Sequence, residues 1–157
     1  GYEDGAFQPD KPVTRAEFSK MAVTLFGYSI ENKDCSFTDV PADSWAYPYI
    51  AALCAEEIAN GTGDGNFGAG EGITRQDMAV MLYRIAQKKQ VTLGNTQSND
   101  FSDAAAVADY AKTAVETLCA AGVLTGMDDG SFAPQIPVTR AQAAVMMKRF
   151  MEAGGAR

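Results

Sequence analysis

Three arginines that each follow a threonine are the residues in this sequence best suited to bind a charged ligand. Each pair lies seven residues after the phenylalanine that ends a glycine-rich segment, and the pairs are Thr14-Arg15, Thr74-Arg75 and Thr139-Arg140. Because threonine is a common helix N-cap, each arginine is predicted to lie in the first turn of a helix. A guanidinium beside unpaired helix amides can bind a carboxylate or a phosphate. The alternative is that the arginine only packs over the preceding loop.

The arginines belong to a larger internal repeat. They are spaced by 60 and 65 residues, which is typical of stacked supersecondary units. A second block occurs only twice, as Phe37…Asp39…Trp45…Cys54 and Phe101…Asp103…Tyr110…Cys119. The chain is therefore expected to form a single domain of two and a half repeats. Residues 1–28 form the C-terminal half of repeat 1, residues 35–89 form repeat 2 and residues 100–152 form repeat 3.

The helices after the arginines have clear start signals. Thr14 and Glu17 fit a capping box, and Thr74 with Asp77 and Thr139 with Gln142 fit weaker versions of it. Apolar residues then recur at helical spacing and are predicted to face the core: Phe18, Met21, Ala22, Leu25 and Phe26; Met78, Met81, Leu82 and Ile85; Ala143, Met146, Met147 and Phe150.

A second helix is expected in each complete repeat, over about 44–59 and about 109–121. Pro48 is placed in the first turn, and Asn60-Gly61 and Gly122 are expected as C-caps. Any strand is expected to be short and near Phe67 and Phe132. The predicted fold class is all-α.

Composition excludes several classes of function. The 13 basic and 20 acidic side chains give a net charge of −7, which disfavours a nucleic-acid partner or a broad anionic membrane contact. No segment approaches the roughly 20 apolar residues of a membrane span. The first residues lack the features of a signal peptide, so we expect any export signal to be removed or upstream.

Metal, cofactor and catalytic sites are not expected. The chain has no histidine and no CxxC pair among its three cysteines, and we interpret Cys54 and Cys119 as small buried thiols. The segment Gly63–Gly68 matches a dinucleotide fingerprint but follows a helix instead of a strand. The Asp-Gly loops lack the ligand pattern of an EF-hand, although a structural calcium site remains an alternative. No unique pair of carboxylates suits glycoside hydrolysis, so the repeated motif favours binding.

The combination of Phe37-Thr38-Asp39, Trp45-Ala46, Gly61…Phe67 and Thr74-Arg75 resembles the S-layer homology repeat of bacterial cell-surface proteins. The resemblance covers nearly the whole chain outside two linkers, at 27–36 and 88–100. It implies a pseudo-threefold bundle of helical repeats whose inter-repeat grooves bind secondary cell-wall polysaccharide, often capped by a pyruvylated amino sugar. It also implies an extracellular location at the cell surface.

The same resemblance implies a set of ligand-binding residues. The family's Thr-Arg-Ala-Glu motif is complete at residues 14–17 and altered in the other two copies. The implied residues are the arginines Arg15, Arg75 and Arg140 with Glu17, the groove glycines Gly1, Gly61 and Gly126, the aspartates Asp39 and Asp103, and Trp45, which Tyr110 replaces in repeat 3.

We therefore expect a non-catalytic module that anchors an exported protein to anionic wall polysaccharide. The alternative is a protein-interaction or self-assembly module of a surface protein. The incomplete first repeat predicts that the helix carrying Phe18 and Phe26 lacks a partner and leaves an apolar face partly open. Either an upstream helix covers this face, or the chain self-associates through it.

Overall fold

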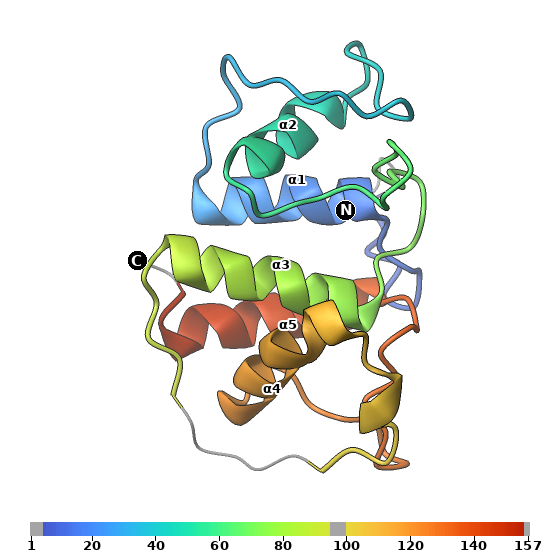
Figure 1. Ribbon diagram of the computed structural model, residues 1–157, viewed down its shortest axis with the longest axis vertical. Helices are drawn as coiled ribbons and strands as arrows, with labels where there is room; N and C mark the ends of the chain where they lie inside the picture. Colours follow the sequence, from blue (N-terminus) through green and yellow to red (C-terminus); the bar gives the residue numbers. More distant parts are fainter. Residues whose placement is uncertain (1–4, 95–99, 156–157) are drawn as a thin grey trace. The chain divides into compact units, whose positions relative to one another are not determined.

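The computed structural model describes residues 5–94 and 100–155, and within them the protein is all-α with no strand, as predicted. The described residues form five α-helices, labelled in Figure 1: α1 (Arg15–Phe26), α2 (Tyr47–Ala55), α3 (Arg75–Lys88), α4 (Lys112–Ala120) and α5 (Arg140–Phe150). Two 3₁₀ turns, η1 (Ala104–Ala106) and η2 (Asp109–Ala111), precede α4, and a π-type turn, η3 (Met151–Gly155), follows α5. None of these helices is long and apolar enough to cross a membrane.

Side-chain caps begin the helices that carry the arginines. Thr14 Oγ1 accepts a hydrogen bond from the Glu17 amide at 3.1 Å, and the Glu17 carboxylate accepts one from the Thr14 amide at 2.9 Å. Thr139 and Gln142 form a second complete capping box at the start of α5. Both boxes satisfy amides that the first helical turn leaves without an intrahelical partner. The predicted starts of these helices are confirmed.

The other two helices are shorter than predicted. Pro48 lies in the first turn of α2 as expected, but α2 ends at Ala55. It ends there because Glu57 adopts a left-handed conformation with φ of 57°. The expected C-cap at Asn60-Gly61 is therefore wrong. The expectation at Gly122 is confirmed, since this glycine has φ of 71° directly after the last residues of α4.

The chain packs as two compact units that cut across the sequence repeats. Among the described residues, the α1–α2 unit comprises residues 13–73, and the α3–α5 unit comprises residues 5–12, 74–94 and 100–155. In the first unit, α2 of repeat 2 packs on α1 of repeat 1, as Figure 1 shows. In the second unit, α4 of repeat 3 packs on α3 of repeat 2. In both units, the helix that carries the arginine therefore packs against the first helix of the next repeat.

This pairing overturns the expectation of an open face on the first helix. Phe18 is fully buried and Phe26 is 6% exposed, while Met21 is half-buried and Leu25 is 39% exposed. The partner of α1 is α2, and repeat 1 needs no upstream helix for that contact. With Phe18 and Phe26 buried, the expected cause of self-association through this face is absent, and self-association itself stays a prediction. The other predicted core residues are buried: Ala22, Met78, Met81, Leu82, Ile85, Ala143, Met146, Met147 and Phe150.

Extended structure in the described residues is limited to three isolated antiparallel bridges. They are Pro12 with Thr139, Thr14 with Gly72 and Thr74 with Pro137. The bridges lie at the threonines and at residues two positions before them, not at Phe67 and Phe132, where any short strand was expected. Their effect is to align each arginine-bearing helix start with a loop of another repeat.

Candidate functional site

The amides at the start of α1 and α3 are already paired. The Arg15 amide donates to the Glu71 carbonyl at 2.8 Å, and the Ala16 amide donates to the Ala69 carbonyl at 3.2 Å. In α3, the Arg75 amide donates to the Ile136 carbonyl at 3.0 Å. We expected these amides to be unpaired and able to bind an anion. That expectation is wrong, because they donate hydrogen bonds to backbone carbonyls in a loop of the next repeat.

The arginine side chains bind the same loops. Arg15 Nε donates to the Phe67 carbonyl at 2.8 Å and Nη2 donates to the Asn60 carbonyl at 3.0 Å. The guanidinium carbon lies 4.8 Å from the centre of the Phe67 ring, a cation–π distance. Arg15 is 8% exposed. The loop lies 52 residues after Arg15, so the alternative that the arginine packs over the preceding loop is also wrong.

The geometry recurs in the α3–α5 unit. Arg75 Nε donates to the Phe132 carbonyl and Nη2 to the Thr125 carbonyl, each at 2.7 Å, and the guanidinium carbon lies 4.8 Å from the Phe132 ring centre. Arg75 is 2% exposed, and burial lowers the pKa of its guanidinium. Arg140 is half-buried and donates from Nε to the Phe7 carbonyl at 2.8 Å. All three arginines thus contact the loop of another repeat.

The predicted aspartates bind these loops from the other direction. The Asp39 carboxylate accepts hydrogen bonds from the amides of Phe67, Gly68 and Ala69 at 2.7, 2.8 and 2.9 Å. Burial alone would raise the pKa of Asp39, but these hydrogen bonds hold it below its ordinary value. Asp103 accepts from Phe132 and Ala133 at 2.7 and 2.8 Å. Asp39 and Arg15 therefore meet on one loop.

The two described groove glycines allow an aromatic ring to approach the loop closely. A Cβ at Gly61 would lie 2.6 Å from the Phe37 ring, and a Cβ at Gly126 would lie 2.8 Å from the Phe101 ring. These rings pack on Phe67 and Phe132, with centroids 5.4 Å apart in both pairs. Gly1, the third glycine of the set, lies outside the described residues.

The remaining predicted residues lie apart from this cluster of hydrogen bonds. Glu17 caps α1. Trp45 is 55% exposed, and Lys20 of α1 lies 5.7 Å from its ring centre. Lys20 also lies 5.3 Å from the ring of Tyr49. In repeat 3 the Tyr110 hydroxyl donates instead to Asp77 at 2.7 Å.

The Lys20–Trp45–Tyr49 cluster contains two residues that the sequence analysis did not single out. Lys20 follows Arg15 by five positions on α1, and Tyr49 lies on α2. Only the packing of α2 on α1 brings the ammonium group near both rings. No sequence motif marks that juxtaposition. The backbone carbonyls that accept hydrogen bonds from the arginines also cannot be predicted from the sequence, because every residue type has a carbonyl group.

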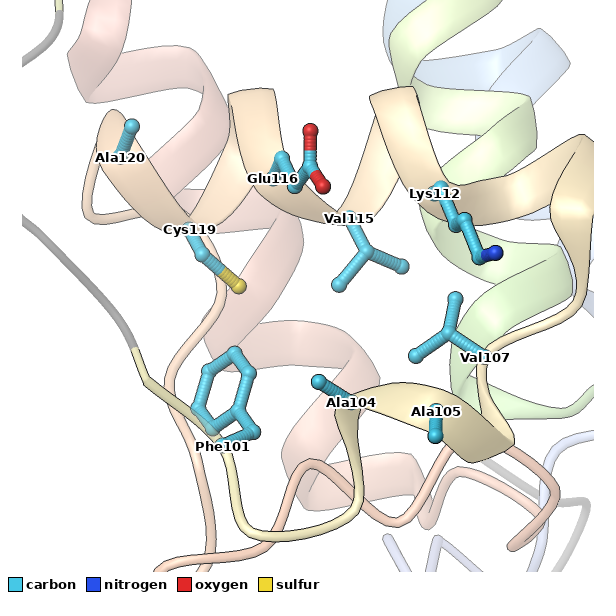
Figure 2. Close-up of a pocket in the computed structure, with 9 residues that line it drawn as sticks. All are labelled: Phe101, Ala104, Ala105, Val107, Lys112, Val115, Glu116, Cys119 and Ala120. Atoms are coloured by element: carbon cyan, nitrogen blue, oxygen red, sulfur yellow. The ribbon is translucent and has the colours of Figure 1, made fainter.

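A pocket of about 470 Å³ lies beside α4, and Phe101 is the one residue of its lining that also packs on a loop described above. Figure 2 shows Phe101, Val107, Val115 and the Cys119 sulfur directed into it, with Lys112 and Glu116 on the α4 side. Cys119 is 1% exposed, and burial raises the pKa of its thiol to about 12, so it is a poor nucleophile. Over the residues that the structure describes, no group of three acidic or cysteine side chains could hold a metal ion.

The structure thus defines a class of helical-repeat protein in which an arginine and an aspartate bind the same loop. The sequence matches the S-layer homology domain over residues 1–19, 36–79 and 100–144. The chain belongs to the S-layer homology domain family, with a partial first segment. This domain is a non-catalytic module that binds the cell wall.

Relatives carry the module within much longer proteins. The chain is 31% identical to an amylopullulanase of Thermoanaerobacterium thermosulfurigenes, over 99% of this chain and 8% of that protein. It is 30% identical to a cellulosome-anchoring protein of Acetivibrio thermocellus, over 98% of this chain and 35% of that protein. It is 32% identical to a surface-layer 125 kDa protein of Lysinibacillus sphaericus, over 97% of this chain and 13% of that protein. The chain therefore spans about a third or less of each of these relatives.

Proposed function

We propose that this chain is a non-catalytic module that anchors a surface protein to the bacterial cell wall by binding anionic secondary cell-wall polysaccharide. The observation that carries the proposal is the repeated arrangement in which an arginine and an aspartate bind one loop, within a chain of the S-layer homology family. A feature repeated without a unique residue suits the recognition of a repeating polymer. Relatives named as surface-layer and cellulosome-anchoring proteins support the cell-surface location.

The ligand end that fits best is a pyruvylated amino sugar. Its carboxylate is attracted by the positive charge of Arg15, Arg75 and Arg140, whose guanidinium groups hold the loops by their own hydrogen bonds. Because the whole chain carries a net charge of −7, an anionic polymer requires local cations of this kind. In the α1–α2 unit, Lys20 adds a second cation beside the exposed Trp45 ring, which offers an apolar surface for a sugar face.

A pseudo-threefold arrangement of the repeats is part of the proposal. Arg15 of repeat 1 contacts the loop of repeat 2, Arg75 of repeat 2 contacts the loop of repeat 3, and Arg140 of repeat 3 contacts the loop of repeat 1. This cyclic order is what a threefold bundle requires. It provides three related positions at which the polymer could be bound.

Co-sedimentation with purified cell walls tests the proposal. The chain should pellet with intact walls and should remain in solution when the walls have been stripped of secondary polysaccharide. Light scattering without walls should report a monomer. Equal pelleting with stripped walls would reject the polysaccharide as ligand. Concentration-dependent assembly without walls would favour the self-assembly alternative.

A further inference from the structure

Two cysteines lie on elements that pack together in the α1–α2 unit. Cys35 belongs to the segment between α1 and α2, and Cys54 lies in the last turn of α2. Both are half-buried and neither is bonded in the structure. We propose that Cys35 and Cys54 are an oxidisable pair, and that a disulfide between them fastens the segment before Asp39 onto α2. The proposal is independent of the wall ligand.

Hydrogen bonds already attach Cys35 to α2. The Cys35 amide donates to the Tyr47 hydroxyl at 3.3 Å, and that hydroxyl donates to the Cys35 carbonyl at 3.4 Å. Tyr47 and Cys54 are seven residues apart on α2, so they lie on nearly the same face of the helix. Cys35 is thus held over the face of α2 that also presents Cys54.

The α3–α5 unit indicates independently how close the segment before α2 lies to Cys54. Figure 2 shows the Cys119 sulfur and the Phe101 ring lining the same pocket beside α4. Phe37 and Cys54 are the corresponding residues of repeat 2. Phe37 also has the geometry of Phe101, because both pairs of stacked rings have centroids 5.4 Å apart with interplanar angles of 45° and 44°.

Cys35 lies only two residues before Phe37, which is at most about 7 Å of chain. The correspondence between the repeats implies that Phe37 faces Cys54 as Phe101 faces Cys119, which would bring Cys35 within two residues of chain from a neighbour of the same sulfur. The ionisation of the thiols agrees with this proximity. Burial, and then the nearby Cys35, raise the pKa of Cys54 to about 11.

Oxidation would proceed by thiol–disulfide exchange with a low-molecular-weight disulfide. The Cys35 thiolate attacks one sulfur of the oxidant, forms a mixed disulfide and releases one thiol. The Cys54 thiolate then attacks the Cys35 sulfur and releases the second thiol. The protein loses two protons and two electrons, and the oxidant is reduced to two thiols. Because burial also raises the pKa of Cys35, the rate should increase with pH.

Cys119 is the built-in control. It lies in the other packing unit, is 1% exposed and has no cysteine beside it in that unit. Its thiol should remain reduced under conditions that oxidise the pair.

The test is to treat the folded chain with excess oxidised glutathione at about pH 8.5 and to measure intact mass, free thiols and a peptide map. We expect a monomer lighter by two hydrogen atoms, with one free thiol, a Cys35–Cys54 cross-link and a raised thermal midpoint that dithiothreitol reverses. Cys119→Ser should give the same cross-link. Cys54→Ser should stop at a mixed disulfide on Cys35. A wild-type chain that also stops at the mixed disulfide, forms dimers or uses Cys119 would overturn the proposal, and this result does not depend on the variants.

Discussion

Arg75 binds the carbonyl oxygen of Phe132, 57 residues further along the chain, through its Nε at 2.7 Å. Arg15 and Phe67 are related in the same way at 2.8 Å across 52 residues. The arginine of each Thr-Arg pair therefore joins one repeat to another. The loss of an arginine should therefore affect the stability of the fold as well as the affinity for the wall ligand.

Replacing Arg75 by Ala should destabilise the fold. The change removes two charged hydrogen bonds and leaves the Phe132 and Thr125 carbonyls without these donors, which should cost about 3 kcal/mol. Arg75→Lys should recover only part of the loss, because lysine lacks the planar fork. Urea unfolding at neutral pH measures the effect. Equal stability of wild type and Arg75→Ala would show that these hydrogen bonds contribute nothing net.

The same variant should bind wall polysaccharide more weakly. Measured at a temperature where the variant is fully folded, the affinity should fall by about 1.5–3 kcal/mol, because the change removes a positive charge and releases the loop that Arg75 holds. Arg84, on the same helix but outside the motif, provides the control for general charge. Equal losses from Arg84→Ala and Arg75→Ala would reject a specific role for Arg75.

Replacing Gly61 by Ala should destabilise the α1–α2 unit. The added Cβ would lie 2.6 Å from the Phe37 ring and also against the Asn66 carbonyl oxygen, so the ring has to move. Overpacking of this kind costs about 1–3 kcal/mol. Gly70→Ala is the matched control, because a Cβ there meets nothing within 4 Å. Thermal melts of both variants make the comparison, and similar midpoints would refute the packing role of Gly61.

The Asp39 carboxylate should make stability depend on pH. Its folded-state pKa is lowered, so its contribution is fully present above the ordinary pKa of about 4 and is lost as the pH falls through the folded-state value. Asp39→Asn should cost about 1 kcal/mol at pH 7, since the carboxylate is exposed, and the difference from wild type should shrink below pH 4. Urea unfolding from pH 7 to pH 2.5 tests this sign. Asp43→Asn, at an exposed position, controls for the lost charge, and a gap that widens in acid would contradict the assignment.

Loss of the Thr14 cap should lower both stability and affinity. Thr14→Ala removes the acceptor for the Glu17 amide at the helix start, which costs about 1 kcal/mol. The looser first turn should also weaken the binding of polysaccharide near Arg15. Thr24→Ala, at an exposed position of α1, should leave both unchanged. A shifted melt with unchanged binding by the folded variant would mean that the cap serves only the fold.

Local signals in the sequence were sufficient for the helices after the arginines. Thr14 with Glu17, and the apolar spacing from Phe18 to Phe26, fixed both the start and the buried face of α1. The end of α2 was not predictable, because Glu57 takes a left-handed conformation that residue type does not favour. The open face was wrongly predicted because a repeat in sequence was treated as the packing unit.

For the site, as for the fold, the sequence predicted features set by neighbouring residues but not contacts between distant ones. The motif identified Arg15, Asp39 and Gly61, which the structure places around one loop. It could not show that the helix amides would be occupied by carbonyls, since any residue supplies a carbonyl. Lys20 near Trp45 also depends on how α2 packs on α1. Contacts across about 50 residues require the three-dimensional fold.

Calorimetric titration of this chain with purified secondary wall polysaccharide tests the central claim most directly. The polymer should be used intact and after mild removal of its pyruvyl groups, with Lys20→Gln and Trp45→Ala as variants outside the arginine–loop contacts. We predict saturable binding of the intact polymer, binding at least tenfold weaker without pyruvyl groups, and a loss of affinity in both variants without a change in melting temperature. Equal affinity for the two polymers, or no binding to either, would contradict the account.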